Sequence, residues 1–340
     1  MEPHFEEEKE SCGHEGSRLF KGLPAIHNAI ARFADASGFA VNRQQWSSIS
    51  SNRSRFGLIF MTSEPSANPD TILRRHPVLA YFALTFVLSW MGALAVAASH
   101  LVRQQPLPKI SGILMFPVML LGPSCAGVLL RRIVDGKSGL QALLSEIFRV
   151  SVAPRWYAAL LLPPISVLVV LLFLKTVVST VYAPNHFLPG VFFSIPAGFL
   201  EEIGWMGYAF PKMSSQNNAL APSVLLGLIW GVWHLPVIDF LGSATPHGVY
   251  MFPFFISFTF AMTAMRVLIA WIYTNTKSIF LAQLMHISST SSLVLFGPPG
   301  VTARQEVSWY VLYGSVLWLA VAIIIRVFGK RLTRQVNGPQ

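Results

Sequence analysis

Charged residues are scarce in this sequence. Lys, Arg, Asp and Glu make up 12% of its 340 residues, while 53% are hydrophobic. Soluble globular domains carry about 25% charged residues. The shortage, together with a mean hydropathy of +0.53, excludes an ordinary water-soluble domain. The composition instead predicts an all-α polytopic membrane protein.

Cysteine and internal repetition are also nearly absent. The two cysteines, Cys12 and Cys125, offer neither a disulfide framework nor the spacing of a cysteine metal site. Cys125 lies in an apolar stretch, where we expect a small core residue. No segment recurs at a fixed period, so neither a solenoid nor an inverted-repeat transporter is supported.

Long apolar runs are what the sequence does contain. A helix needs about 20 apolar residues to cross the hydrocarbon core of a bilayer. Eight stretches approach that length, although the seventh is short and the fourth carries two glutamates. They cover residues 77–99, 112–130, 156–178, 190–210, 219–241, 252–274, 278–296 and 308–328. About eight spans are therefore predicted, with both termini on one side of the membrane.

Basic residues divide unequally between the two sets of connecting loops. The side of the termini has Arg74, Arg75, Arg131, Arg132, Lys137, Arg149, Arg155, Lys212, Lys277, Arg326, Lys330, Arg331 and Arg334. The other side has Arg103, Lys109, Lys175 and Arg304. This bias predicts cytoplasmic termini, and we expect an integral protein of a prokaryotic plasma membrane. The excess of basic residues on the side of the termini also accounts for much of the net charge of +10, so no nucleic-acid partner is predicted.

The two ends differ in character from the middle. Residues 1–70 begin with the acidic run EEEKE, continue into polar sequence and lack the apolar core of a signal peptide. We expect a largely disordered cytoplasmic extension there, a membrane domain over residues 71–332 and a basic cytoplasmic tail over 333–340. Met61 precedes a short polar lead into the first span, so a chain starting there would also contain the membrane domain.

Ionisable side chains inside a span are costly, so each one is a candidate functional residue. Those in or near the predicted spans are Glu201, Glu202, His234, Asp239, Arg266 and His286. Adjacent helical residues point about 100° apart. Glu201 and Glu202 are therefore expected to have separate partners and separate roles.

Each of the two histidines has a polar or aromatic residue one helical turn away. Trp230 precedes His234 by four residues, and Thr290 follows His286 by four, so each pair shares a helix face. A single buried histidine is more typical of a core imidazole bonded to a backbone carbonyl. Two histidines and two glutamates on three spans favour one shared site.

Two chemistries fit these residue types. A carboxylate beside an imidazole can take a proton from water as a general base, and a second histidine can donate hydrogen bonds to an oxyanion. Alternatively, Glu201, His234 and His286 could bind zinc with one position open for water. The spacing does not decide between them.

Other protease signatures are incomplete. His14 and Glu15 are followed by Arg18 rather than by the second histidine of a zinc helix. Ser124, in GPSCAG, lacks the full serine nucleophile turn. Asp239 has no second aspartate with which to form an intramembrane aspartyl pair.

Three motifs in order carry a resemblance to a known family. EEIGWMGY, WGVWHLP and QLMHISST, distributed over the predicted spans between about residues 75 and 300, resemble the CPBP family of intramembrane proteases. This family includes type II CAAX prenyl endopeptidases and bacteriocin-processing or immunity proteins. The resemblance implies that Glu201 activates water with help from His234, that Glu202 supports the site and that His286 stabilises the oxyanion.

The sequence departs from the family pattern at three positions. Met206 stands where an arginine is expected, Trp230 replaces a phenylalanine and Thr290 replaces an asparagine. Without the arginine, Glu202 lacks its expected positive partner. Arg266 either replaces that arginine or reaches from a helix end to the membrane interface.

The expected function is an intramembrane endopeptidase for a membrane-embedded or lipid-anchored, CAAX-like substrate. Its partners would be the lipid bilayer and a peptide or lipidated protein. Zinc is a possible cofactor, held if present by Glu201, His234 and His286. Two alternatives stay open, namely a catalytically silent immunity or binding protein on the same scaffold and a proton-coupled transporter.

Overall fold

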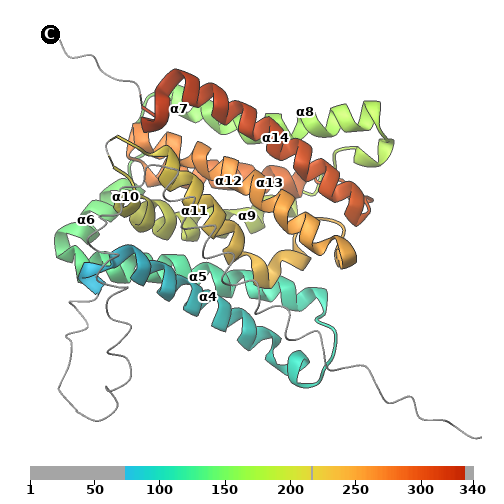
Figure 1. The fold of residues 1–340 in the computed structure, drawn as a ribbon, viewed down its shortest axis with the longest axis horizontal. Helices are drawn as coiled ribbons and strands as arrows, with labels where there is room; N and C mark the ends of the chain where they lie inside the picture. Colours follow the sequence, from blue (N-terminus) through green and yellow to red (C-terminus); the bar gives the residue numbers. More distant parts are fainter. Residues whose placement is uncertain (1–72, 216, 334–340) are drawn as a thin grey trace, which may run out of the picture. The chain divides into compact units, whose positions relative to one another are not determined.

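The computed structural model describes residues 73–215 and 217–333, and these residues form a bundle of helices (Figure 1). Within this part of the chain the only β-type pairing is an isolated bridge between Ser215 and Asn218. The predicted all-α class is therefore confirmed. The expectations for residues 1–70 and for the tail beyond Thr333 concern segments outside the described residues.

The α-helices follow one another along the described chain, and the longest connection leads from α11 to α12. They are α4 (Pro77–Val102), α5 (Lys109–Val134), α6 (Gly136–Ile147), α7 (Pro154–Ala158), α8 (Leu162–Val177), α9 (Pro189–Gly204), α10 (Phe210–Met213), α11 (Leu220–Trp233), α12 (Met251–Thr276), α13 (Ile279–Phe296) and α14 (Ala303–Phe328).

The predicted number of eight spans is not confirmed. Six segments of the described residues are long and apolar enough to cross a membrane, and α9 and α11 are not among them. With 14 residues, α11 reaches only about 21 Å. It ends at Trp233 because Pro236 lacks a backbone N–H and lies in a 3₁₀ turn over Leu235–Phe240. The 16 residues of α9 continue directly into a π-helical turn, Trp205–Ala209, and α10.

The helices are arranged in three layers (Figure 1). The pair α4 and α5 forms one outer layer, α8 and α14 form the other, and α9, α11, α12 and α13 lie between them. Of the six candidate spans, α12 is the most enclosed, with 72% of its apolar window buried inside the protein. The glutamate helix and both histidine motifs therefore lie in the middle layer.

Small residues allow the middle helices to approach closely. A Cβ atom added at Gly227 of α11 would lie 2.7 Å from the Cα of Thr263 on α12. At Gly231, one turn later, it would lie 2.5 Å from a methyl group of Thr259. Only glycine fits at both positions, and this contact brings Trp230 against α12.

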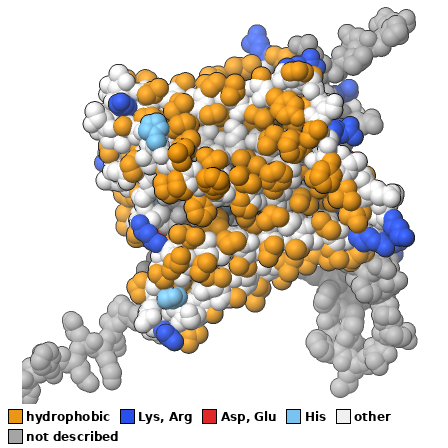
Figure 2. Space-filling view, turned by 180° about the vertical axis from the view of Figure 1, so that it is seen from behind, with side chains coloured by type: hydrophobic (Ala, Val, Ile, Leu, Met, Phe, Trp, Pro, Cys, Tyr) orange, Lys and Arg blue, Asp and Glu red, His pale blue; other side chains and the backbone are white. Residues whose placement is uncertain are grey.

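Apolar side chains cover most of the face shown in Figure 2, and Lys and Arg lie near the edges of that face. Phe192 and Phe193 of α9 are 74% and 62% exposed, as expected of side chains that contact lipid. The prediction that Cys125 is a core residue is wrong. Cys125 is exposed on α5, since its position faces away from the helices that pack against α5.

Candidate active site

The last turn of α9 carries both predicted glutamates into the protein interior. Glu201 is 2% exposed and Glu202 is fully buried. A buried carboxylate is tolerated only where hydrogen bonds and opposite charges replace its water. The partners of the two residues differ, as their angular separation on the helix predicts.

Glu202 is held by charged or polar groups from two other helices. Arg266 Nη1, on α12, donates to both carboxylate oxygens at 2.8 and 2.7 Å. His286 Nδ1, on α13, lies 2.7 Å from Oε1. Because an ionised carboxylate only accepts hydrogen bonds, this nitrogen carries the donated proton.

Arg266 is the positively charged partner of Glu202. Its side chain is fully buried, which excludes the alternative of a residue reaching to the interface. The guanidinium carbon lies 4.1 Å from the centre of the Trp230 ring, a close cation–π contact. Met206, where the family pattern has arginine, is an uncharged and fully buried side chain. The positive charge thus comes to Glu202 from α12 instead of from the next turn of its own chain.

Within the described part of the chain, Glu201 accepts hydrogen bonds at one oxygen only. Its Oε2 accepts hydrogen bonds from the indole Nε1 of Trp205 at 3.1 Å and of Trp230 at 2.6 Å. No described residue donates to Oε1. That oxygen is left as the free acceptor of the carboxylate.

Trp205 was not identified from the sequence, although it follows Glu201 by four residues, the spacing of one helical turn. It opens the π-helical turn Trp205–Ala209. π-Helical turns are rare in proteins, and those that occur are frequently located at functional sites. Arg131 of α5 holds this turn, since its Nε donates to the carbonyl oxygen of Gly207 at 2.8 Å.

His234 lies at the end of α11 with one nitrogen engaged. Its Nδ1 is 2.8 Å from the carbonyl oxygen of Trp230. A carbonyl only accepts, so Nδ1 carries a proton, and Nε2 of the neutral ring is free to accept one. The His234 and His286 ring centres each lie 5.2 Å from the centre of the Trp230 ring, so both imidazoles contact the same indole.

Not every predicted residue joins this cluster. Glu201, Glu202, Trp230, His234, Arg266 and His286 are connected by the contacts described above. Thr290, on α13 after His286, forms no hydrogen bond with any of them within the described chain. Asp239 lies in a separate polar cluster, described below.

The suggested zinc ligands do not fit a metal site as they are placed. Among the described residues, no group of three or more His, Cys, Asp or Glu side chains is arranged to hold a metal ion. The chemistry agrees with this geometry. Two indole donors occupy Oε2 of Glu201, and the Arg266 cation lies against the Trp230 ring that contacts both imidazoles. A divalent cation would meet that fixed positive charge.

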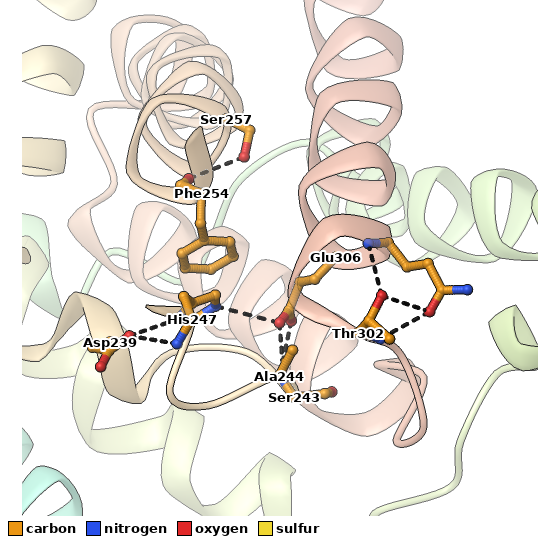
Figure 3. Close-up of polar contacts among 9 residues, drawn as sticks. Asp239, Ser243, Ala244, His247, Phe254, Ser257, Thr302 and Glu306 are labelled. Atoms are coloured by element: carbon orange, nitrogen blue, oxygen red, sulfur yellow. Dashed lines mark hydrogen bonds and ion pairs between the residues drawn. The ribbon is translucent and has the colours of Figure 1, made fainter. Parts of the chain in front are cut away.

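A third buried carboxylate, which no sequence pattern indicated, lies in the first turn of α14 (Figure 3). Glu306 is 1% exposed and accepts hydrogen bonds from the backbone N–H groups of Ser243 and Ala244, both at 2.8 Å. It thereby closes the loop that leads from α11 to α12. Thr302, at the N-cap of α14, forms a capping box with Gln305 and sets the start of that helix.

His247 joins the same loop to both of its acidic neighbours. Its Nδ1 lies 3.1 Å from Asp239 Oδ1, and its Nε2 lies 3.4 Å from Glu306 Oε2 as an ion-pair contact. The ring also stacks on Phe254, with centres 3.9 Å apart (Figure 3). Burial alone would lower the pKa of His247, but the carboxylates of Glu306 and Asp239 raise it above its ordinary value.

Comparison with known proteins matches the segment that contains these residues. Residues 183–291 match the family model described as type II CAAX prenyl endopeptidase Rce1-like. This segment of the chain is similar to the CAAX prenyl endopeptidases. It includes both glutamates, both histidines and Arg266, and it confirms the resemblance carried by the three motifs.

A curated relative points to the same family. The chain is 28% identical over 144 residues to "CAAX prenyl protease 2" of Methanococcus maripaludis. The aligned part covers 42% of this chain and 50% of that protein, so the chain spans about half the length of the curated relative it matches. This likeness agrees with the family match over residues 183–291.

Proposed function

We propose that this protein is an intramembrane endopeptidase that hydrolyses a peptide bond in a lipid-anchored, CAAX-like protein or peptide. The observation that carries the proposal is the convergence of Glu201, Glu202, His234 and His286 from three helices in a buried site. Three acceptor or donor atoms of these side chains, Glu201 Oε1, His234 Nε2 and His286 Nε2, have no partner within the described chain. They are available for water and substrate.

In this proposal Glu201 is the general base. Its Oε1 takes a proton from water as the water oxygen forms a bond to the scissile carbonyl carbon. Nε2 of His234, which has no proton in the neutral ring, accepts the other hydrogen bond of that water and orients it. When the C–N bond breaks, the protonated Glu201 returns the proton to the leaving amine.

His286 is the proposed oxyanion donor. Because its Nδ1 proton is directed at Glu202, the ring donates from Nε2 only when both nitrogens are protonated. The site then holds two carboxylates, one imidazolium and one guanidinium, and its charges cancel. Glu202 and Arg266 act through His286, since they hold the cation where negative charge develops on the carbonyl oxygen.

The relatives and the sequence support the proposed substrate class and cellular location. The matching family and relative are named for CAAX prenyl substrates, and a lipid-modified chain end would partition into the bilayer beside the apolar outer face. We propose the plasma membrane as the location, with both termini in the cytoplasm as the loop charges predict.

The test is cleavage of a fluorogenic, farnesylated CAAX peptide by the purified, detergent-solubilised protein. Glu201→Gln is expected to lower kcat at least about 10³-fold, within the range for removal of a general base. Glu306→Gln is the matched control, since it changes another buried glutamate outside the site. Cleavage by the unaltered protein is expected to survive a chelator. Equal cleavage by Glu201→Gln and the unaltered protein would contradict the proposal.

A further inference from the structure

Two tryptophans from different segments hold the same oxygen of Glu201. Trp205 belongs to the π-helical turn after α9, and Trp230 belongs to α11, yet both indole N–H groups point at Oε2. Both rings are buried, with exposed fractions of 0% and 2%. A buried carboxylate with two donors on one oxygen and none on the other has a defined orientation.

Trp230 also contacts the other members of the site. Its ring lies under the Arg266 guanidinium and against the edges of both imidazoles, and its backbone carbonyl accepts from His234 Nδ1. A phenylalanine, which the family pattern has at this position, would provide a ring face but no N–H donor. Trp230 provides both a ring face for the Arg266 guanidinium and an N–H donor for Glu201.

We propose that Trp205 and Trp230 are positioning residues for the hydrolysis, an inference that rests on the proposed function. Their N–H groups fix Glu201 through Oε2, so that Oε1 alone accepts the proton of the attacking water. The indoles keep their own protons throughout. Their contribution is orientation of the base relative to water, which affects the chemical step more than substrate binding.

The discriminating experiment replaces single indole N–H groups and leaves ring shape unchanged. Incorporation of 3-benzothienylalanine at position 230 substitutes sulfur for the N–H in an isosteric ring. We expect kcat for the farnesylated peptide to fall about 10- to 100-fold, as for loss of a hydrogen bond to a charged group. KM should stay within twofold. The same change at position 205, where the bond is longer, should lower kcat about 3- to 10-fold.

Trp271 provides the matched control. Its indole Nε1 is buried and has no hydrogen-bond partner, and its ring packs on Trp156 and Phe328 away from the glutamates. The isostere at position 271 is expected to leave kcat within twofold. If the isostere at 230 also leaves kcat unchanged while Trp230→Phe lowers it, ring shape alone matters and the proposal is overturned.

A second measurement separates this proposal from the proposed function. The carboxylate stretching band of Glu201 is isolated as the infrared difference between the unaltered protein and Glu201→Gln. It should shift with the isostere at 205 or 230 and not at 271, whether or not the protein cleaves the peptide. Absence of cleavage by the unaltered protein would reject the proposed function, whereas an unmoved carboxylate band would reject the indole hydrogen bonds themselves.

Discussion

Two buried glutamates in this bundle have contrasting surroundings. Glu202 is satisfied by side chains of α12 and α13, one of them an imidazole whose second nitrogen remains free. Glu306 is satisfied by two backbone N–H groups of a loop and by His247, whose ring is engaged by carboxylates on both sides. A buried carboxylate does not by itself mark an active site. What distinguishes the two is whether their partners retain free functional atoms.

The largest expected effect comes from neutralising each glutamate in turn. Glu202→Gln leaves Arg266 buried without its counter-charge, which should cost about 3–5 kcal/mol of stability. It should also lower kcat of the remaining folded enzyme about 100-fold, because His286 loses its anion. Glu306→Gln should cost about 1–3 kcal/mol and leave kcat per folded molecule within twofold. Thermal unfolding in detergent and peptide cleavage give the two readouts. Comparable kcat losses in Glu202→Gln and Glu306→Gln would contradict the proposed difference between a glutamate of the active site and a structural one.

The position of the arginine that pairs with Glu202 can be tested by transferring it from residue 266 to residue 206. Arg266→Met is expected to lower kcat about 100-fold, since Glu202 then has only His286 as a partner. Adding Met206→Arg places an arginine one turn after Glu202, where the family pattern has it. This double variant should recover about tenfold in kcat over Arg266→Met. A double variant no more active than Arg266→Met would show that the position of the arginine, and not only its charge, is required.

The contact between Glu306 and the 241–247 loop depends on Gly242. Its φ of +78° and the 2.1 Å between an added Cβ and Glu306 Oε1 leave no room for a side chain. Gly242→Ala should destabilise the protein by about 1–3 kcal/mol and open the 241–247 loop to proteases. Gly248→Ala is the control, because Gly248 also has a positive φ of +56° but no atom within 4 Å of the added Cβ. Equal losses would assign the effect to backbone conformation and not to contact with Glu306.

The smallest expected effect is a pH dependence of stability. The pKa of His247 in the folded protein is raised by Glu306 and Asp239. Its contribution is therefore fully present below the unfolded pKa of about 6.5 and is lost as pH rises through the folded value. The unfolding midpoint should fall over that interval above pH 6.5, and His247→Gln should flatten the fall. An unchanged slope in His247→Gln would show that another group causes the dependence.

Much of the site could be predicted because its signals are local. Charged residues inside apolar runs can be recognised directly in the sequence. The spacing from Trp230 to His234 places both side chains on one helix face. The eight-span prediction is not confirmed at α9 and α11, because apolar runs do not show where a helix stops within them. Pro236 ends α11 early, and a π-helical turn follows α9.

Composition and long apolar runs by themselves determined that this chain is an all-α membrane protein, and three motifs determined which glutamates and histidines to consider. The tertiary structure alone decided their partners. Arg266 lies 64 residues from Glu202, and Trp230 lies 29 residues from Glu201. Close packing of α11 on α12 at two glycines joins them, and no local pattern encodes which buried cation meets which buried anion. The Glu306 loop closure, 62 and 63 residues apart, escaped the sequence for the same reason.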